Sequence, residues 1–355
     1  MSNAPSTPSA KTSPAPPPHA LPPGYAFIEW VACGEFESKL LEVLDPGQAP
    51  AAISVVPMDQ KRPEGVEEFR SLKVSLEIGG HPNVLKYRRA WLLTEDGKFI
   101  DALHQTAWPR SGWEQTSLFI EMELAKGSLA TRLNECRQQQ LPGIPAAELL
   151  PLLLQAARGI DHLCDEGVVP QDVNPANLLI VGGEVKVANY GRIPDEERLG
   201  KLTDPKPFST ANYAPQGWST RRIPRRFDTL YSLAVSGYHL LSGSLPFRSA
   251  TPGWVPPQDA REAHDSRQLD FRSVSKEMEA VLLQAIDKQP PFLTCVAFVE
   301  ALTAAWERSA VSAGSGSTRC AHDSTRELPS LGNSPTTAQP TSSATRAQPP
   351  STRQP

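Results

Sequence analysis

Apolar residues change their spacing midway along this chain of 355 residues, and that change limits the folds the chain can adopt. Between Tyr25 and Met122 the apolar runs are short and suit strands, as in AAISVV and LFIEME. From Leu149 onward, runs such as LLPLLLQAARGIDHL and YSLAVSGYHLLSG carry apolar residues at helical spacing. We therefore predict an α+β fold in which a small β-rich lobe precedes a larger helical lobe.

Both ends of the chain have compositions that disfavour folding. Residues 1–23 contain eight Pro with Lys11 as the single charged side chain, and residues 309–355 are rich in Ser, Thr and Pro without an apolar period. Such segments bury too little apolar surface to offset the loss of chain entropy, so we expect two disordered tails. The folded domain is expected at 24–308, with the small lobe at about 24–123 and the large lobe at about 124–308.

The composition argues against several classes of protein. The net charge of −4 and the pI near 6.0 do not suit a domain that binds nucleic acid mainly through phosphates. No apolar run reaches the roughly 18–20 residues of a membrane-spanning helix, and the Pro-rich start lacks the charged-then-apolar order of a signal peptide. We expect a soluble, cytoplasmic protein with no membrane span and no nucleic acid partner.

The five cysteines and seven histidines follow none of the spacings that are typical of metal sites or disulfide frameworks. The cysteines are odd in number, widely spaced and without a CxxC pair. We expect reduced, mostly buried thiols and no metal catalysis through His or Cys. The cysteines are Cys33, Cys136, Cys164, Cys295 and Cys320.

The segment VVPQDVNPANLLI, followed closely by EVKVANYG, is the most specific pattern in the chain. It resembles the catalytic loop and the metal-binding loop of eukaryotic-type Ser/Thr protein kinases, normally HRDLxxxN and DFG. Other segments resemble family elements in family order: WVACGEF the glycine-rich loop, AAIS the VAIK strand, GGHPNVLKY the segment after helix αC, SLFIEMELAKGSL the hinge, YAPQ the APE motif and LLSGSLPF the end of helix αF. The resemblance covers roughly residues 24–308 and implies a two-lobed protein-kinase-like fold.

Several positions depart from what the resemblance implies for phosphoryl transfer, in which a Lys–Glu ion pair and magnesium held by Asp and Asn neutralise the charge of ATP. The lysine position is Ser54, which carries no charge, and the αC glutamate position falls near Ser71 or Leu72. The DFG aspartate is replaced by Asn189, whose amide is a weaker magnesium ligand than a carboxylate, while Gly191 is kept. Three charged groups of the phosphate site are therefore missing.

The glycine-rich loop keeps only Gly34, with Ala32 and Glu37 at its first and third glycine positions. A carboxylate at Glu37 would repel a triphosphate where the backbone should approach it. Met122 and Glu123 occupy the hinge positions that the resemblance assigns to nucleotide binding. The altered glycine-rich loop disfavours tight binding of ATP.

The catalytic loop retains Asp172 and Asn177, which the resemblance makes the acceptor-orienting and metal-binding residues. A structural alternative is that Asp172 braces the loop by accepting backbone N–H bonds around Pro175, with Asn177 bonded to Asp172. Because the other charges are lost, we favour the structural alternative. The remaining family residues of the loop are replaced by Pro170, Gln171 and Asn174.

Two further family features are altered in the large lobe. The buried ion pair of the APE glutamate has Gln216 and Phe292 as its candidate positions, and losing both partners is compatible with a stable fold. The αF aspartate position falls on Asp228 or Thr229, and the sequence leaves that register open.

Two features outside the active site could bind a protein partner. An insert near GKFIDALHQTAWPRSGWEQ carries Trp108 and Trp113, and exposed Trp beside Arg is typical of interface anchors. The alternative is that both rings pack on the small lobe as local core. A run of arginines could dock an acidic partner, or could be a solvated loop. The run consists of Arg221, Arg222, Arg225 and Arg226.

We therefore predict a pseudokinase, a catalytically impaired kinase-like domain that acts as a binding, scaffold or regulatory module without a cofactor. The alternative is an active or weakly active Ser/Thr kinase that uses ATP and magnesium. Lys39 supports this alternative, because it lies two residues after Glu37 at the position of the family's Val and should face the nucleotide pocket. Nothing comparable replaces the charge lost at Asn189, and the family's metal positions are Asn177 and Asn189.

Overall fold

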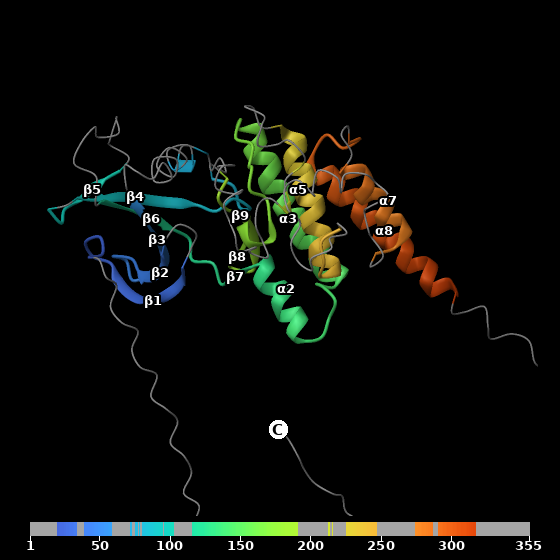
Figure 1. Ribbon diagram of the computed structural model, residues 1–355, viewed down its shortest axis with the longest axis horizontal. Coiled ribbons are helices and arrows are strands. Elements are labelled where there is room, and N and C mark those ends of the chain that lie inside the picture. Colours follow the sequence, from blue (N-terminus) through green and yellow to red (C-terminus); the bar gives the residue numbers. More distant parts are fainter. Residues whose placement is uncertain are drawn as a thin grey trace, which may run out of the picture. The chain divides into compact units, whose positions relative to one another are not determined.

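The computed structural model of the protein contains an antiparallel sheet of six strands followed by a helical part (Figure 1). This is the two-lobed α+β arrangement that the apolar spacing predicts. The structure describes residues 20–33, 39–58, 72, 75–76, 78, 80–94, 96–102, 116–190, 212–213, 215, 225–246, 274–286 and 290–316.

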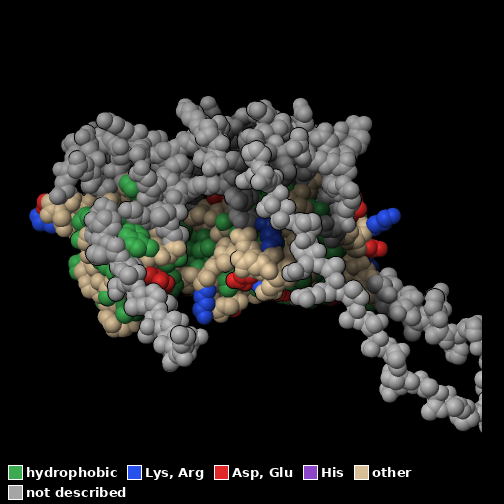
Figure 2. Space-filling view, turned by 60° about the horizontal axis from the view of Figure 1, so that its bottom comes forward, with side chains coloured by type: hydrophobic (Ala, Val, Ile, Leu, Met, Phe, Trp, Pro, Cys, Tyr) green, Lys and Arg blue, Asp and Glu red, His purple; other side chains and the backbone are tan. Residues whose placement is uncertain are grey.

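The small-lobe sheet has the strand order β1-β2-β3-β6-β4-β5. Its strands are β1 (Ala26–Cys33), β2 (Lys39–Leu44), β3 (Pro50–Met58), β4 (Tyr87–Leu93), β5 (Phe99–Asp101) and β6 (Thr116–Met122). At the β1 edge, Ile28 and Val31 are partly exposed, and Figure 2 shows hydrophobic side chains at the surface on the left of its view. Two register shifts in β1 make this edge irregular, which disfavours pairing with another chain.

The small-lobe sheet buries apolar side chains on both faces. Successive residues of a strand point to opposite faces, so Ile53 packs in one cluster with Phe119, whereas Val56 packs in the other with Ile120. The second cluster includes Leu72, which is 3% exposed. Leu72, one of the two candidates for the αC glutamate position, therefore contributes to apolar packing.

A second sheet, of three strands, contains a hairpin, and the candidate site lies at the open end of that hairpin. Its turn contains Gly182 and Gly183, whose φ values of 62° and 90° favour glycine. At the other end Leu178 pairs with Val187, and Val187 also forms a parallel bridge to Val84 of the small lobe. The strands are β7 (Gly127–Ser128), β8 (Leu178–Val181) and β9 (Glu184–Val187).

The large lobe is built around a helical core. Leu153 and Ile160 of α3, Leu233 of α5 and Phe298 of α8 are fully buried in one cluster. Helix α5 ends at Gly243, whose φ of 73° provides the left-handed C-cap. The elements are α2 (Leu129–Gln138), α3 (Ala146–Asp165), the 3-10 helix η2 (Pro175–Asn177), α5 (Arg226–Ser242), α7 (Lys276–Ala285) and α8 (Cys295–Gly316).

Helix α8 continues past the expected domain boundary at residue 308. Residues 309–316 lack the apolar period that the prediction required, but they contain no Pro and include Ala310 and Ala313, the residue type with the highest helix propensity. The boundary of the C-terminal tail therefore falls inside a helix. None of the helices in the part of the chain that the structure describes is long and apolar enough to span a membrane.

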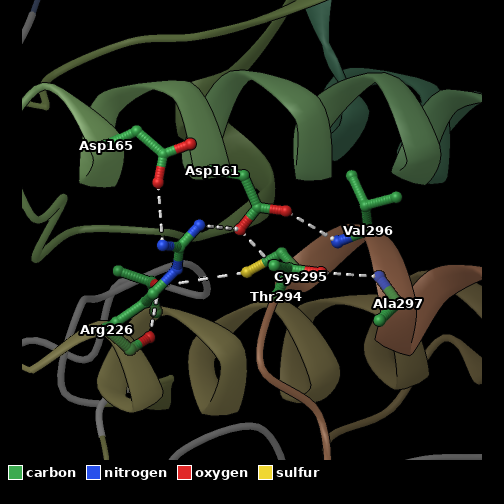
Figure 3. Close-up of polar contacts among 8 residues, drawn as sticks. Asp161, Asp165, Arg226, Thr294, Cys295, Val296 and Ala297 are labelled. Atoms are coloured by element: carbon green, nitrogen blue, oxygen red, sulfur yellow. Dashed lines mark hydrogen bonds and ion pairs between the residues drawn. The ribbon is translucent and has the colours of Figure 1, made fainter.

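Asp161 of α3 joins three helices of the large lobe (Figure 3). Its Oδ1 accepts the backbone N–H of Cys295 at 3.0 Å, and its Oδ2 accepts that of Val296 at 2.9 Å. Arg226 of α5 donates to the same carboxylate at 3.1 Å and to Asp165 at 2.9 Å. Asp161 thus satisfies two free N–H groups at the start of α8 and pairs with a cation on α5.

This ion pair changes the interpretation of the arginine run. Arg226 is 33% exposed and holds Asp161 and Asp165, so it is a structural residue and not a free docking group. Arg225 is exposed at the start of α5. The positions of Arg221 and Arg222 lie outside the described residues.

The structure also places the two positions left open for the αF aspartate. Thr229 is fully buried and donates its hydroxyl to the Arg226 carbonyl at 2.7 Å, whereas the Asp228 carboxylate accepts the Arg225 N–H at 2.9 Å. Thr229 therefore faces the core, and Asp228 caps the helix.

Of the two candidate positions for the buried ion pair, Phe292 packs edge-on against Phe298, with ring centroids 5.8 Å apart. Gln216 lies outside the described residues.

Three cysteines are described with their side chains, and all three are free, as predicted. Cys136 and Cys295 are buried, and Cys164 is half-buried. Burial raises the pKa of the Cys164 thiol to about 11 and that of Cys295 well above its ordinary value. The Cys164 and Cys295 thiols are therefore protonated and unreactive at neutral pH.

Tyr213, in the segment resembling the APE motif, contacts a buried histidine of α5. Its hydroxyl lies 2.7 Å from Nδ1 of His239, and Nε2 of His239 lies 3.4 Å from the Arg137 guanidinium. Burial, and then the positive charge of Arg137, lowers the pKa of His239 to about 4. His239 is therefore neutral in the folded protein.

We expect this histidine to make the folded state sensitive to acid. The unfolded chain binds a proton at His239 near pH 6.5 and the folded chain only near 4, so stability is complete above about pH 6.5 and falls as the pH drops toward 4. The expected loss between pH 7 and pH 5 is about 2 kcal/mol. Urea unfolding at several pH values should show this slope in the wild type and a weaker slope in His239→Asn. Equal slopes would contradict the assignment.

Candidate active site

Ser54 stands on β3 at the position that the resemblance assigns to the phosphate-binding lysine. The side chain is half-buried, and its strand neighbours are Leu40 on β2 and Ile120 on β6. Lys39 pairs with Val55, one position away from Ser54. The backbone register therefore does not place residue 39 opposite Ser54, and the Lys39 side chain lies outside the described part of the structure.

The hinge residue Glu123 binds the β8–β9 hairpin. Lys186 of β9 holds both carboxylate oxygens of Glu123, with Nζ–O distances of 2.8 and 2.9 Å. The backbone N–H of Lys86 donates to the same carboxylate at 2.9 Å. The two ion-pair side chains are 13% and 19% exposed, so Lys186 ties the strand before Asn189 to the hinge. Met122, just before Glu123, packs against the apolar cluster of the small-lobe sheet.

The β8–β9 hairpin brings Asn177 and Asn189 together. Asn177 ends η2 immediately before β8, and Asn189 lies two residues after β9. The N–H of Ala188 donates to the Asn177 carbonyl at 2.9 Å, which extends the hairpin by one step. The side-chain Nδ2 of Asn189 then donates to Oδ1 of Asn177 at 2.8 Å.

The catalytic loop is held by its own side chains. Asn174 caps η2 by accepting the N–H groups of Ala176 at 2.9 Å and Asn177 at 3.2 Å, and its Nδ2 donates to Oδ1 of Asp172 at 2.7 Å. The Nδ2 of Asn177 donates to the Asp172 carbonyl at 2.9 Å. The predicted bond between Asn177 and Asp172 is therefore present. The Asp172 carboxylate, however, accepts a side-chain N–H of Asn174. Oδ1 of Asn174 is the atom that accepts the backbone N–H groups of Ala176 and Asn177 after Pro175.

Tyr190 anchors residues 188–190, which follow β9. The ring is buried, and its hydroxyl lies 3.1 Å from the Leu85 carbonyl and 3.3 Å from that of Ser75. Burial raises the pKa of Tyr190 to about 12, so the hydroxyl remains a hydrogen-bond donor. Its ring also packs edge-on against Tyr87, with centroids 5.7 Å apart.

Comparison with known proteins identifies this arrangement. Residues 48–292 match the family model described as the protein kinase domain. The chain belongs to the protein kinase family. A solved structure, that of the PknI kinase domain of Mycobacterium tuberculosis, matches 82% of this chain and 100% of its own chain, with a TM-score of 0.54 and 20% sequence identity. At that identity, the likeness bears on the fold.

Curated relatives of this kinase-family chain include bacterial proteins. PknF, a serine/threonine-protein kinase of Mycobacterium tuberculosis H37Rv, is 27% identical over 200 residues, which are 52% of this chain and 40% of PknF. SCO3848, a probable serine/threonine-protein kinase of Streptomyces coelicolor, is 26% identical over 178 residues, 49% of this chain and 26% of the relative. The match thus spans less than half the length of these relatives.

The kinase family implies magnesium and ATP at this site, and the side chains present do not fit the metal. Magnesium requires oxygen ligands, usually including a carboxylate. Asn189 presents an N–H donor to Oδ1 of Asn177 and brings no carboxylate to these positions. Ser54 offers a hydroxyl in place of the family's cation. Among the described residues, no cluster of three or more His, Cys, Asp or Glu side chains could hold a metal ion.

Several predicted site residues lie outside the described part of the chain. They are Gly34, Glu37, Ser71, Trp108, Trp113 and Gly191. The structure thus brings together Asp172, Asn177 and Asn189 and leaves the glycine-rich loop and the Trp-bearing insert undescribed.

Three interactions at the site were not predicted from the sequence. The caps made by Asn174 could have been inferred from Asn before Pro at the start of a turn, which is a typical capping arrangement. The Glu123–Lys186 pair joins residues 63 positions apart, and no local pattern indicates it. The Tyr190 hydroxyl is an addition to the DFG pattern, whose Phe has no donor.

Proposed function

We propose that this kinase-family chain is a pseudokinase, a catalytically impaired domain that acts as a binding, scaffold or regulatory module. The observation that carries the proposal is the series of hydrogen bonds that joins the two side chains at the family's metal positions to the catalytic loop. Asn189 donates to Asn177, Asn177 donates to Asp172, and Asn174 donates to the Asp172 carboxylate. Magnesium-dependent phosphoryl transfer needs carboxylate oxygens at this place.

The second candidate is an active or weakly active Ser/Thr kinase that binds ATP and magnesium with Lys39 in place of the missing lysine. The relatives PknF, a serine/threonine-protein kinase, and SCO3848, a probable one, favour it. The strand register offers it no support, because Leu40 and not Lys39 lies opposite Ser54. We therefore rank it second.

A titration with ATP tests the proposal. A ligand that binds only the folded state at a hundredfold excess over its Kd stabilises that state by about 2.7 kcal/mol, which would raise the melting temperature by roughly 5 °C. Because the site lacks the cation at Ser54 and the carboxylate at Asn189, we expect no magnesium-dependent shift at cellular ATP concentrations. Transfer of γ-phosphate to the protein itself or to generic substrates should also be absent.

Two matched variants separate the candidate functions. A magnesium-dependent shift that disappears in Lys39→Ala and persists in Ser54→Ala would replace the pseudokinase by the relocated-lysine kinase. Phosphate incorporation that vanishes in Asp172→Asn would have the same consequence. If neither shift nor incorporation occurs in the wild type, the pseudokinase proposal stands.

The remaining proposals concern organisation and partners. We place the folded domain at about 24–308, extended by the end of α8, and keep a protein as the partner class. Trp108 and Trp113 remain candidate anchors of that partner, whereas Arg226 is engaged with Asp161 and Asp165. A cytoplasmic location also remains a proposal.

A further inference from the structure

We propose that the hydrogen bond between the side-chain amides of Asn177 and Asn189, the amide bridge, takes the structural place of a metal ion. It holds residues 188–190 against the catalytic loop without any ligand. The inference rests on the proposed function, because it assumes that no metal is needed at these positions. It goes further by assigning a role to the residue that replaced the metal ligand.

The hairpin geometry makes the two amides neighbours. Leu178 pairs with Val187, and the Ala188 N–H to the Asn177 carbonyl continues the ladder outward. The next contact is between side chains, at 2.8 Å from Nδ2 of Asn189 to Oδ1 of Asn177. The bridge therefore closes the open end of the β8–β9 hairpin.

The direction of each bond follows from the neighbouring groups. The Asp172 carbonyl can only accept, so Asn177 must turn its Nδ2 toward it, at 2.9 Å. Oδ1 of Asn177 then faces Asn189, which must present its own Nδ2. An amide satisfies this geometry as a neutral donor, whereas a carboxylate would place acceptor against acceptor and would need a cation between them.

The backbone at position 189 allows this exchange of side chains. Asn189 has a φ of 55°, in the left-handed region that Asn and Asp adopt more readily than other residues with a side chain. Replacing Asn189 by Asp therefore changes the donor into an acceptor and leaves the backbone conformation accessible. The neighbouring Tyr190 remains tied through its hydroxyl to the Leu85 or Ser75 carbonyl.

Melting temperatures of three proteins, measured without nucleotide and with EDTA or excess magnesium chloride, test the inference. The wild type should melt at the same temperature in both. Asn189→Asp should melt about 2–4 °C lower in EDTA and should recover part of that loss in magnesium, because the ion can lie between the new carboxylate and Oδ1 of Asn177. Asn189→Ala, the control without a metal ligand, also strains the left-handed backbone, so it should lose at least as much stability and recover none in magnesium.

Three outcomes would overturn the inference. They are a wild type that magnesium stabilises, an Asn189→Asp variant as stable as the wild type in EDTA, and an Asn189→Asp variant whose loss magnesium does not reduce. Native-state hydrogen exchange gives an independent readout, because the Ala188 N–H should exchange faster in Asn189→Ala than in the wild type. No ATP or phosphoryl transfer enters these measurements, so failure here and failure of the pseudokinase proposal are distinguishable.

Discussion

Asp161→Ala should lower the free energy of unfolding by about 3–5 kcal/mol, since it removes one partner of a largely buried ion pair. The Asp161 side chain is 12% exposed, and its carboxylate serves Arg226 together with the N–H groups of Cys295 and Val296. Without it, a partly buried guanidinium loses one of its two carboxylates, and helix α8 loses two acceptors at its start. Urea denaturation followed by circular dichroism measures the change.

Asp165→Ala is the matched control for this variant. Asp165 binds the same Arg226, at 2.9 Å, but its side chain is 66% exposed. An exposed ion pair contributes at most about 1 kcal/mol, so the control should remain close to the wild type. Equal losses in the two variants would show that the charge of Arg226 matters and that the capping of α8 does not.

Gly159→Ala should destabilise the protein by about 3 kcal/mol through a backbone clash. A Cβ at this position of α3 would lie 2.2 Å from the Asn83 carbonyl oxygen, which cannot rotate away as a side chain could. The same carbonyl accepts the Val187 N–H at 2.9 Å. The substitution should therefore disturb β9, and we expect faster hydrogen exchange at Val187 as well as a lower unfolding midpoint.

Gly237→Ala provides the comparison within a buried helix. Among the described residues, its Cβ would meet Cδ1 of Leu153 alone, at 3.2 Å, and a side-chain end can shift by a few tenths of an ångström. Both substitutions gain about 1 kcal/mol of helix propensity, so their difference isolates the clash. Similar stabilities of the two variants would mean that the backbone around Asn83 moves away from the new Cβ at little cost.

The fold class and the location of the site were predictable from local patterns. Strand-like runs before Met122 and helical spacing after Leu149 gave the order of the lobes, because side-chain periodicity depends on nearby residues alone. The motif around Asp172 and Asn189 predicted the protein kinase fold, and the family match over residues 48–292 confirms that fold. Residue identity at Ser54 and Asn189 was likewise visible at once.

Helix boundaries and helix phase were less predictable. The end of α8 at Gly316 was missed because its last turns carry no apolar stripe. The choice between Asp228 and Thr229 depended on which residue the helix turns toward the core, and packing against neighbouring helices decides that. Thr229 is fully buried in the structure.

By itself, the sequence determined which chemical groups the site contains: an uncharged Ser54, the retained Asp172 and Asn177, and an amide at Asn189. Only the tertiary structure decided what those groups bind. The partners are far apart in the chain, since Asn189 meets Asn177 across 12 positions, Lys186 meets Glu123 across 63, and Asp161 meets Cys295 across 134. Hydrogen bonds form between neighbours in space, and the folding of the hairpin and helices creates those neighbours.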